Sequence, residues 1–476
     1  MKYIHNLLTL LLATFVASCN LLDVKVKDQL TSTAVESLSG AEALNIGAYN
    51  AMQSAIYYGA EMICLPEVLA DNCYLRQGAS IFSEQSQNVS GYHLDVWTTS
   101  YEMLSAVNTS IRYCEGQAAS AHRDAILGES YFLRGLIYMN LAKIYGREAA
   151  HLLNGFDRSV PLLLAPFETK GGVIADEAAV ERASVNDVWA QVTKDLIAAF
   201  DLLEGNDKAT NLYRANAHAA KALLSRAFLY QEKWSEAVTA ASDALTYTPD
   251  TELYGGDYVN IFKDGYESLF AIRFLTNESL GSSSLHSTYG TVDNGIRDEE
   301  GYGDGNSGSG DGLFAVDEAL VALYPEGDTR LGAMRKVNFG GFKYWWTTKF
   351  NSWGGAFGVD EVPVIRLSEV LLNRAEALAE AGRMAEARED IDLLRSKRDL
   401  PATDAVDAML LDEILLQRRL ELAFEGHRFF DLKRRGMDIT KPQGKPALAY
   451  DDFRVVARVP EVEMDVNKKL VQNPGY

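Results

Sequence analysis

The sequence predicts a mainly α-helical protein in which antiparallel helix pairs form a frame and a loop-rich insertion carries short β-strands. Segments 216–249 and 370–400 both place small and apolar residues at the offsets typical of tetratricopeptide-like units. Between residues 252 and 363 the helical period of the apolar residues fades, and short aromatic and β-branched runs replace it. These observations together indicate helical repeats interrupted by a structure of another kind.

The first eighteen residues have the features of an export signal. Lys2 precedes an apolar run from Leu7 to Val16, which is too short to span a membrane, and the small residues Ala17 and Ser18 follow. The segment that ends in Cys19 resembles the lipobox of bacterial lipoproteins, so we expect Cys19 to become a lipidated amino terminus and residues 19–30 to form a tether. An ordinary secretory signal, with the cysteine there by chance, is the alternative.

The helix pairs are expected within about 120–250 and 364–436, inside a domain spanning 31–476. In the unit 216–249, Ser225 lies where the first helix is crossed, Trp234 opens the second helix and Pro249 stops it. A looser third unit starts near Glu129, where an apolar stripe has helical spacing. The stripe is followed at intervals of seven by three tyrosines, for which packing is favoured over a ligand-binding ladder: Tyr131, Tyr138 and Tyr145.

The insertion, about 252–363, is expected to hold strands at 270–274 and 342–350. Between them, residues 301–312 include six glycines, too many for a packed element. Insertions on solenoid-like frames fall on one face, which is often the binding face. We therefore expect the ligand to bind there.

Composition excludes several classes of function. The chain has 66 acidic and 45 basic residues and a formal charge of −21, which argues against nucleic acid and against anionic lipid surfaces as partners. Besides Cys19 there are three cysteines, so at most one disulfide can form, and Cys64 with Cys73 is the closest pair. Residues 304–309 suggest a calcium loop only faintly, because Gly308 and Ser309 stand where an EF-hand has an acidic ligand and a glycine, and the closing glutamate is missing. We expect no metal and no cofactor.

Several segments, in the expected order, resemble the SusD/RagB family of nutrient-binding outer-membrane lipoproteins. Residues 364–377 (VIRLSEVLLNRAEA) and 418–434 (RRLELAFEGHRFFDLKR) match its most specific motifs. Residues 95–108, 131–146 and the carboxy-terminal 472–476 (QNPGY) match further ones. The resemblance covers the whole mature chain.

The resemblance implies a SusD-like fold, with four tetratricopeptide-like pairs and a ligand site in the loop-rich remainder. It implies an outer-membrane protein, lipid-anchored and facing the cell exterior, that binds oligosaccharides or polysaccharides. A SusC-like TonB-dependent transporter would be the partner that imports them. Two alternatives stay open: the same machinery binding peptides or glycoprotein fragments, and a protein-interaction scaffold without a small ligand.

The charged segment 418–434 could be taken for acid/base machinery, since Glu421, Glu425 and His427 lie close together in it. We favour an ion-pair and capping network that closes a helix at Gly426, because the family carries this segment across many ligands. No catalytic motif occurs elsewhere, so we expect no enzymatic activity.

Glycan binding needs exposed flat aromatic rings, with polar side chains that fix the hydroxyl groups. On a strand Trp345 and Trp346 face opposite sides, so only one of them is expected to be accessible. The other candidates come from the insertion and from the loop after the first helix, where the family commonly places ligand contacts. The full candidate set is Asp71, Asn72, Tyr74, Arg76, Tyr289, Tyr302, Trp345, Trp346 and Trp353.

Overall fold

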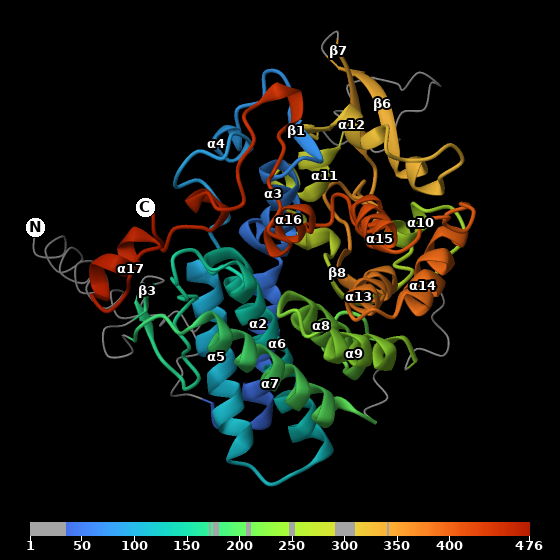
Figure 1. The fold of residues 1–476 in the computed structure, drawn as a ribbon. Helices are drawn as coiled ribbons and strands as arrows, with labels where there is room; N and C mark the ends of the chain where they lie inside the picture. Colours follow the sequence, from blue (N-terminus) through green and yellow to red (C-terminus); the bar gives the residue numbers. More distant parts are fainter. Residues whose placement is uncertain are drawn as a thin grey trace, which may run out of the picture.

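The computed structural model describes residues 35–170, 173–174, 180–205, 211–246, 253–290, 310–339 and 342–476 (Figure 1). Its longer helices are α2 (Leu38–Met52), α3 (Glu61–Leu69), α5 (Trp97–Glu115), α6 (Ala121–Tyr145), α7 (Val185–Leu203), α8 (Ala217–Tyr230), α9 (Trp234–Thr246), α13 (Leu367–Glu380), α14 (Met384–Ser396) and α15 (Ala408–Glu421). The shorter α-helices are α4 (Ser83–Ser86), α10 (Asn260–Lys263), α11 (Leu285–Tyr289), α12 (Glu318–Val321), α16 (Arg428–Arg434) and α17 (Glu461–Val466). Short helical turns include η1 (Ala55–Gly59) and η7 (Pro442–Gly444).

The long helices form one continuous stack. Along the series α2, α5, α6, α7, α8, α9, α13 and α14, each helix packs against the next (Figure 1). Serine or asparagine side chains cap the amino ends where a backbone N–H would otherwise lack a partner. Ser120 accepts a hydrogen bond from the backbone of α6, Ser184 from α7 and Asn216 from α8. The stack begins at α2, well before residue 120, where the repeats were expected to start.

The predicted helix pairs are confirmed. The unit 216–249 forms α8 and α9, although Pro249 lies outside the described residues, and the unit 370–400 forms α13 and α14. Ser225, which was expected where the first helix is crossed, is fully buried, as are the small residues Ala237 and Ala387 in α9 and α14. Backbones also approach closely between α6 and α7, where a Cβ on Gly128 would lie 2.7 Å from Cγ of Leu203. Small residues at these crossings therefore set the helix spacing.

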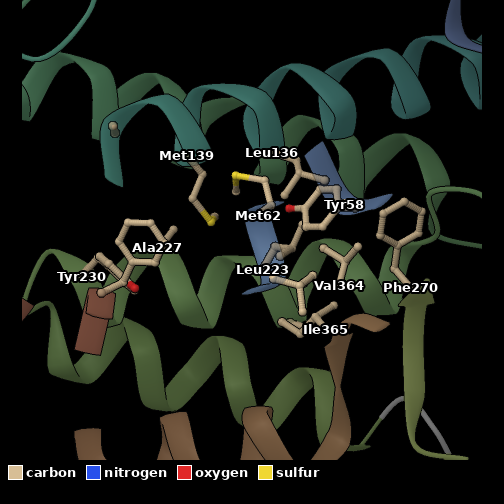
Figure 2. Close-up of a cluster of buried hydrophobic side chains, with 14 of the residues drawn as sticks. Tyr58, Met62, Leu136, Met139, Leu223, Ala227, Tyr230, Phe270, Val364 and Ile365 are labelled. Atoms are coloured by element: carbon tan, nitrogen blue, oxygen red, sulfur yellow. The ribbon is translucent and has the colours of Figure 1, made fainter. Parts of the chain in front are cut away.

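The main core lies where the stack meets the rest of the chain. Figure 2 shows α6 and α8 contributing side chains to a cluster that η1, α3 and two strands complete. Its labelled members are Tyr58, Met62, Leu136, Met139, Leu223, Ala227, Tyr230, Phe270, Val364 and Ile365. Tyr138 and Tyr145 of α6 are buried as well, which confirms packing for these two members of the heptad series. The insertion is thus joined to the helices through a shared apolar core.

The strands within the described residues form three small sheets. One has the order β1 (Cys73–Leu75), β5 (Phe314–Val316), β7 (Phe342–Thr347) and β6 (Met334–Phe339). The other two are the antiparallel pairs β2 (Thr169–Lys170) with β3 (Val173–Ile174), and β4 (Ser268–Ile272) with β8 (Val362–Arg366). Strands β4 and β7 lie where the sequence predicted strands. The four-stranded sheet stands at one end of the molecule, beyond the helical stack (Figure 1).

Cys64, Cys73 and Cys114 are buried free thiols, so the closest pair along the sequence does not form a disulfide here. In the described part of the chain, no helix combines the length and apolarity needed to cross a membrane.

Candidate ligand-binding surface

The charged segment 418–434 forms a buried ion-pair network. Arg366 donates hydrogen bonds to Glu421 at 2.9 Å and to Glu425 at 2.7 and 2.8 Å. Arg398 donates to Glu421 at 2.8 and 2.9 Å, and the Lys349 ammonium lies 2.6 Å from Glu425. The network interpretation is therefore supported. The expected closure at Gly426 is wrong, because α15 ends at Glu421 and Gly426 lies in the turn before α16.

The electrostatics of this network argue against acid/base chemistry. Burial alone would raise the pKa of Glu421, but the guanidinium groups of Arg398 and Arg366 outweigh it and hold that pKa well below its usual range. Burial lowers the pKa of His427 well below its usual value. At neutral pH the carboxylate thus stays charged and the imidazole stays neutral, which suits a structural network.

The same segment fixes the loop that holds Asp71 and Asn72. Arg428 donates two hydrogen bonds to Asp71, at 2.6 and 2.8 Å, and Arg419 donates one to Asn72 Oδ1 at 2.9 Å. Asn72 in turn donates to Glu67 at 2.7 Å, and both candidate side chains are buried. Asp71 and Asn72 therefore hold the loop in place, and the expectation that they contact a ligand is wrong for this conformation.

An aromatic row lies on one face of the four-stranded sheet. Every second residue of β7 places an aromatic ring on this face, namely Phe342, Tyr344 and Trp346. The ring centroids of Phe342 and Tyr344 are 6.2 Å apart, and those of Tyr344 and Trp346 are 5.3 Å apart. Tyr74 packs beside this cluster from β1. We call these four residues the aromatic face. Phe342 is 51% exposed and Tyr74 is half-buried, whereas Tyr344 and Trp346 lie underneath. Two accessible rings on a firm apolar base suit stacking against the C–H face of a sugar.

The two tryptophans of β7 separate as the alternation predicted. Trp346 is buried in the aromatic face, while Trp345 is half-buried on the opposite side, with the Lys336 ammonium 5.4 Å from its ring centroid. Trp346 is therefore not accessible to a ligand, because the sheet cluster covers it. Arg76 donates to the carbonyl oxygens of Asp311 and Gly312, and so it orders the chain beside the sheet.

Two other aromatic candidates serve packing. Tyr289 is fully buried against Phe314, Phe350 and Phe424, so its predicted role as a surface contact is wrong. Trp353 lies in a loop, as expected, but it packs on a separate apolar cluster and donates from Nε1 to the carbonyl of Lys349 at 3.1 Å.

The lipidation of Cys19 and the contact role of Tyr302 lie outside the described residues and stay predictions, and residues 304–309, which suggested a calcium loop only faintly, also lie outside them. Among the described residues there is no group of three or more His, Cys, Asp or Glu side chains that could hold a metal ion.

The sequence interpretation missed Phe342, although the signal for it was present. Phe342 is two residues from Tyr344 on a predicted strand, so the two rings had to share a face. Its exposure follows from its place at the end of β7, which only the folded sheet reveals.

The fold and its aromatic face describe a helical-repeat protein that carries a potential binding surface on its insertion. Comparison with known families gives two matches. Residues 20–229 match the family described as "Starch-binding associating with outer membrane", and residues 324–476 match the SusD family. Both are SusD-type families, and the chain belongs to the SusD/RagB family.

Solved structures share this fold. A SusD superfamily protein from Bacteroides thetaiotaomicron is 24% identical, with a TM-score of 0.78 over 92% of this chain and 100% of that chain. A laminarin-binding SusD-like protein is 21% identical, with a TM-score of 0.71 over 92% of this chain and 99% of that chain. Among curated proteins, SusD-like protein P38 of Formosa agariphila is 24% identical in an alignment of 408 residues that covers 74% of this chain and 74% of that protein. The mainly helical SusD-like fold is confirmed.

Proposed function

We propose that this protein is a lipid-anchored, outer-membrane glycan-binding protein that passes oligosaccharides or polysaccharides to a SusC-like TonB-dependent transporter, without catalytic turnover. The observation that carries the proposal is the aromatic face, which presents Phe342 and Tyr74 on a rigid sheet outside the helical frame. The family descriptions support an outer-membrane setting, and the laminarin-binding relative supports a glycan as ligand.

The polar surroundings of the aromatic face fit this role. Arg76 is anchored to backbone carbonyls beside the sheet, and η7, which contains Gln443, packs against β1, which carries Tyr74. Tyr74 packs on the apolar cluster of the sheet, which limits the motion of its ring before a ligand arrives and reduces the entropy cost of stacking. The proposal therefore places the sugar ring over Phe342 and Tyr74.

Replacing Phe342 or Tyr74 with alanine should weaken glycan binding about two- to twelvefold each, because an aromatic contact contributes about 0.5–1.5 kcal/mol beyond burial. Calorimetry with a panel of neutral and acidic oligosaccharides measures the change, and chromatography of the recovered sugar should show unaltered chain length. The matched control is Tyr266→Ala, since Tyr266 is 46% exposed but stacks on Tyr254 rather than on this sheet. The proposal would be contradicted if the Phe342→Ala and Tyr74→Ala proteins bound glycan as tightly as the Tyr266→Ala control. It would also be contradicted if the protein bound peptides and no glycan.

Replacing Cys19 with alanine should release the protein from the membrane fraction, because the lipid chains that would anchor it could no longer be attached. Cell fractionation followed by immunoblotting measures the shift. Cys114→Ala serves as the control, since Cys114 is a buried thiol within the fold and its removal should leave membrane attachment unchanged. A Cys19→Ala protein that stays fully membrane-bound would count against the lipid anchor.

A further inference from the structure

A cavity of about 270 Å³ opens between the chain that follows α4 and the loop that follows α16. It is larger than the cavities beside Glu129 and beside Phe156, which measure about 60 and 30 Å³. The described residues that line it are Gln87, Asn88, Lys441, Lys445, Pro446, Ala447, Leu448 and Arg454. We call it the cationic cavity.

The lining of the cavity is positively charged, whereas the chain as a whole is negatively charged. Three cations line it and, of the described lining residues, none is acidic, although the chain carries a formal charge of −21. Asp452 pairs with Arg454 at 2.7 Å and neutralises one of the three charges, which leaves Lys441 and Lys445 in excess. Burial lowers the pKa of Lys441 to about 7, so an anion bound nearby would stabilise its charged form.

The loop that carries the two lysines is held in a defined shape. Ile439 and Leu448 exchange backbone hydrogen bonds at 2.8 and 2.9 Å and close the loop at its base. The Lys441 ammonium donates to the carbonyls of Val68 and Leu69, at 2.7 and 3.1 Å, and ties the loop to the end of α3. The Lys441 ammonium is therefore in place before a ligand binds.

Asn88 supplies an independent sign of a ligand. Asn88 is one of the residues that line the cavity, its side chain is buried with 4% of the residue exposed, and its Nδ2 donates to the carbonyl of Leu69 at 3.1 Å. That bond fixes the orientation of the amide, so the group left over is the acceptor Oδ1, which has no hydrogen-bond partner among the described residues. Buried acceptors are normally paired, so Oδ1 calls for a donor such as a hydroxyl group.

The two observations together define the ligand. A simple inorganic anion would satisfy the lysines but offer little to Asn88, whereas a neutral sugar would satisfy Asn88 and leave the lysines without a counter-charge. A sugar that carries both hydroxyl groups and an oxyanion satisfies both. We infer that the cationic cavity is a subsite for an acidic sugar residue, with its carboxylate or sulfate at Lys445 and Lys441 and a hydroxyl donating to Asn88; this inference rests on the proposed glycan-binding function.

The position of the cavity agrees with a glycan that also reaches the aromatic face. Gln443, in η7, lies between the two lysines on the same loop. The loop at η7 also packs against β1, and in Figure 1 the C-terminal chain runs beside α4 and β1. One oligosaccharide could therefore stack on the aromatic face and place a charged residue in the cavity.

Calorimetry with three oligosaccharides of matched length tests the inference: a galacturonide, a sulfated galactan fragment and a neutral galactan fragment. We expect tighter binding of at least one acidic ligand than of the neutral one, and the two acidic arms distinguish carboxylate from sulfate. Lys445→Gln should weaken acidic-ligand binding about tenfold, the effect of one lost charge-assisted hydrogen bond. It should leave neutral-ligand binding unchanged, and Lys445→Arg should retain most of the affinity.

Lys468→Gln is the matched control, because this lysine is 74% exposed after α17, does not line the cavity and changes the net charge equally. Equal loss in both glutamine variants would mean a general charge effect and would overturn the inference. Binding of the neutral fragment with no preference for either acidic one would also overturn it, but would leave the proposed function standing. If the protein bound no oligosaccharide in a broad panel, both the inferred subsite and the proposed glycan-binding function would be wrong.

Discussion

Replacing Arg366 with methionine is expected to destabilise the fold by about 3–5 kcal/mol, because it leaves buried carboxylates without their counter-charge. Arg366 is 1% exposed and forms ion pairs with Glu267, Glu421 and Glu425 at 2.7–2.9 Å. Methionine has a similar length and no polar atom that could hydrogen-bond these carboxylates. Chemical denaturation followed by circular dichroism measures the loss.

The control for this variant is Arg383→Met. Arg383 pairs with Glu386 at 2.5 Å, but both side chains are about half exposed, so water replaces the lost partner. An exposed pair of this kind contributes little to stability, because water solvates both charges. If both variants lost the same small amount, the buried network would not be a source of stability, and segment 418–434 would need another explanation.

Replacing Gly426 with alanine is expected to cost about 2–5 kcal/mol, the sum of two separate penalties. The backbone at Gly426 has φ +81°, in the left-handed region that L-residues disfavour, and a Cβ there would lie 2.5 Å from the carbonyl oxygen of Met62. Because that oxygen belongs to α3, the clash cannot be relieved by rotating a side chain. The melting temperature should fall clearly.

Gly382→Ala separates the two penalties. Gly382 has φ +76°, but a Cβ there would meet nothing within 4 Å, so only the backbone term of about 1–2 kcal/mol applies. Gly426 should therefore be the more sensitive position. If the two variants had equal stability, the close contact between the α15–α16 turn and α3 would be less rigid than the structure shows.

These two predictions concern segments where the sequence signal was strong but its meaning was partly hidden. The pattern of 418–434 identified a network of charges, yet it could not show which partners they find. Arg366 comes from β8, Lys349 follows β7, and Arg398 follows α14. Such partners are distant along the chain, so local periodicity carries no information about them.

For the binding candidates, too, the sequence predicted the local pattern, and the tertiary structure decided which side chains are accessible. Alternation along 342–350 predicted that Trp345 and Trp346 face opposite sides, and the structure confirms it. Which of these sides would join the core depended on how the sheet packs, and Trp346 proved to be covered. Asp71 was expected at a ligand because of its place in the chain, whereas Arg428, 357 residues away, binds it internally.

By itself the sequence determined the helix pairs, the strands of the insertion and the family, because small-residue spacing, hydrophobic period and local motifs are encoded in neighbouring residues. Tertiary structure alone decided which side chains reach the surface. It buried Tyr289, exposed Phe342 and brought Asn88 beside Lys441 and Lys445. The physical reason is that exposure and the pairing of charges depend on contacts between segments tens to hundreds of residues apart, which folding creates and no local pattern records.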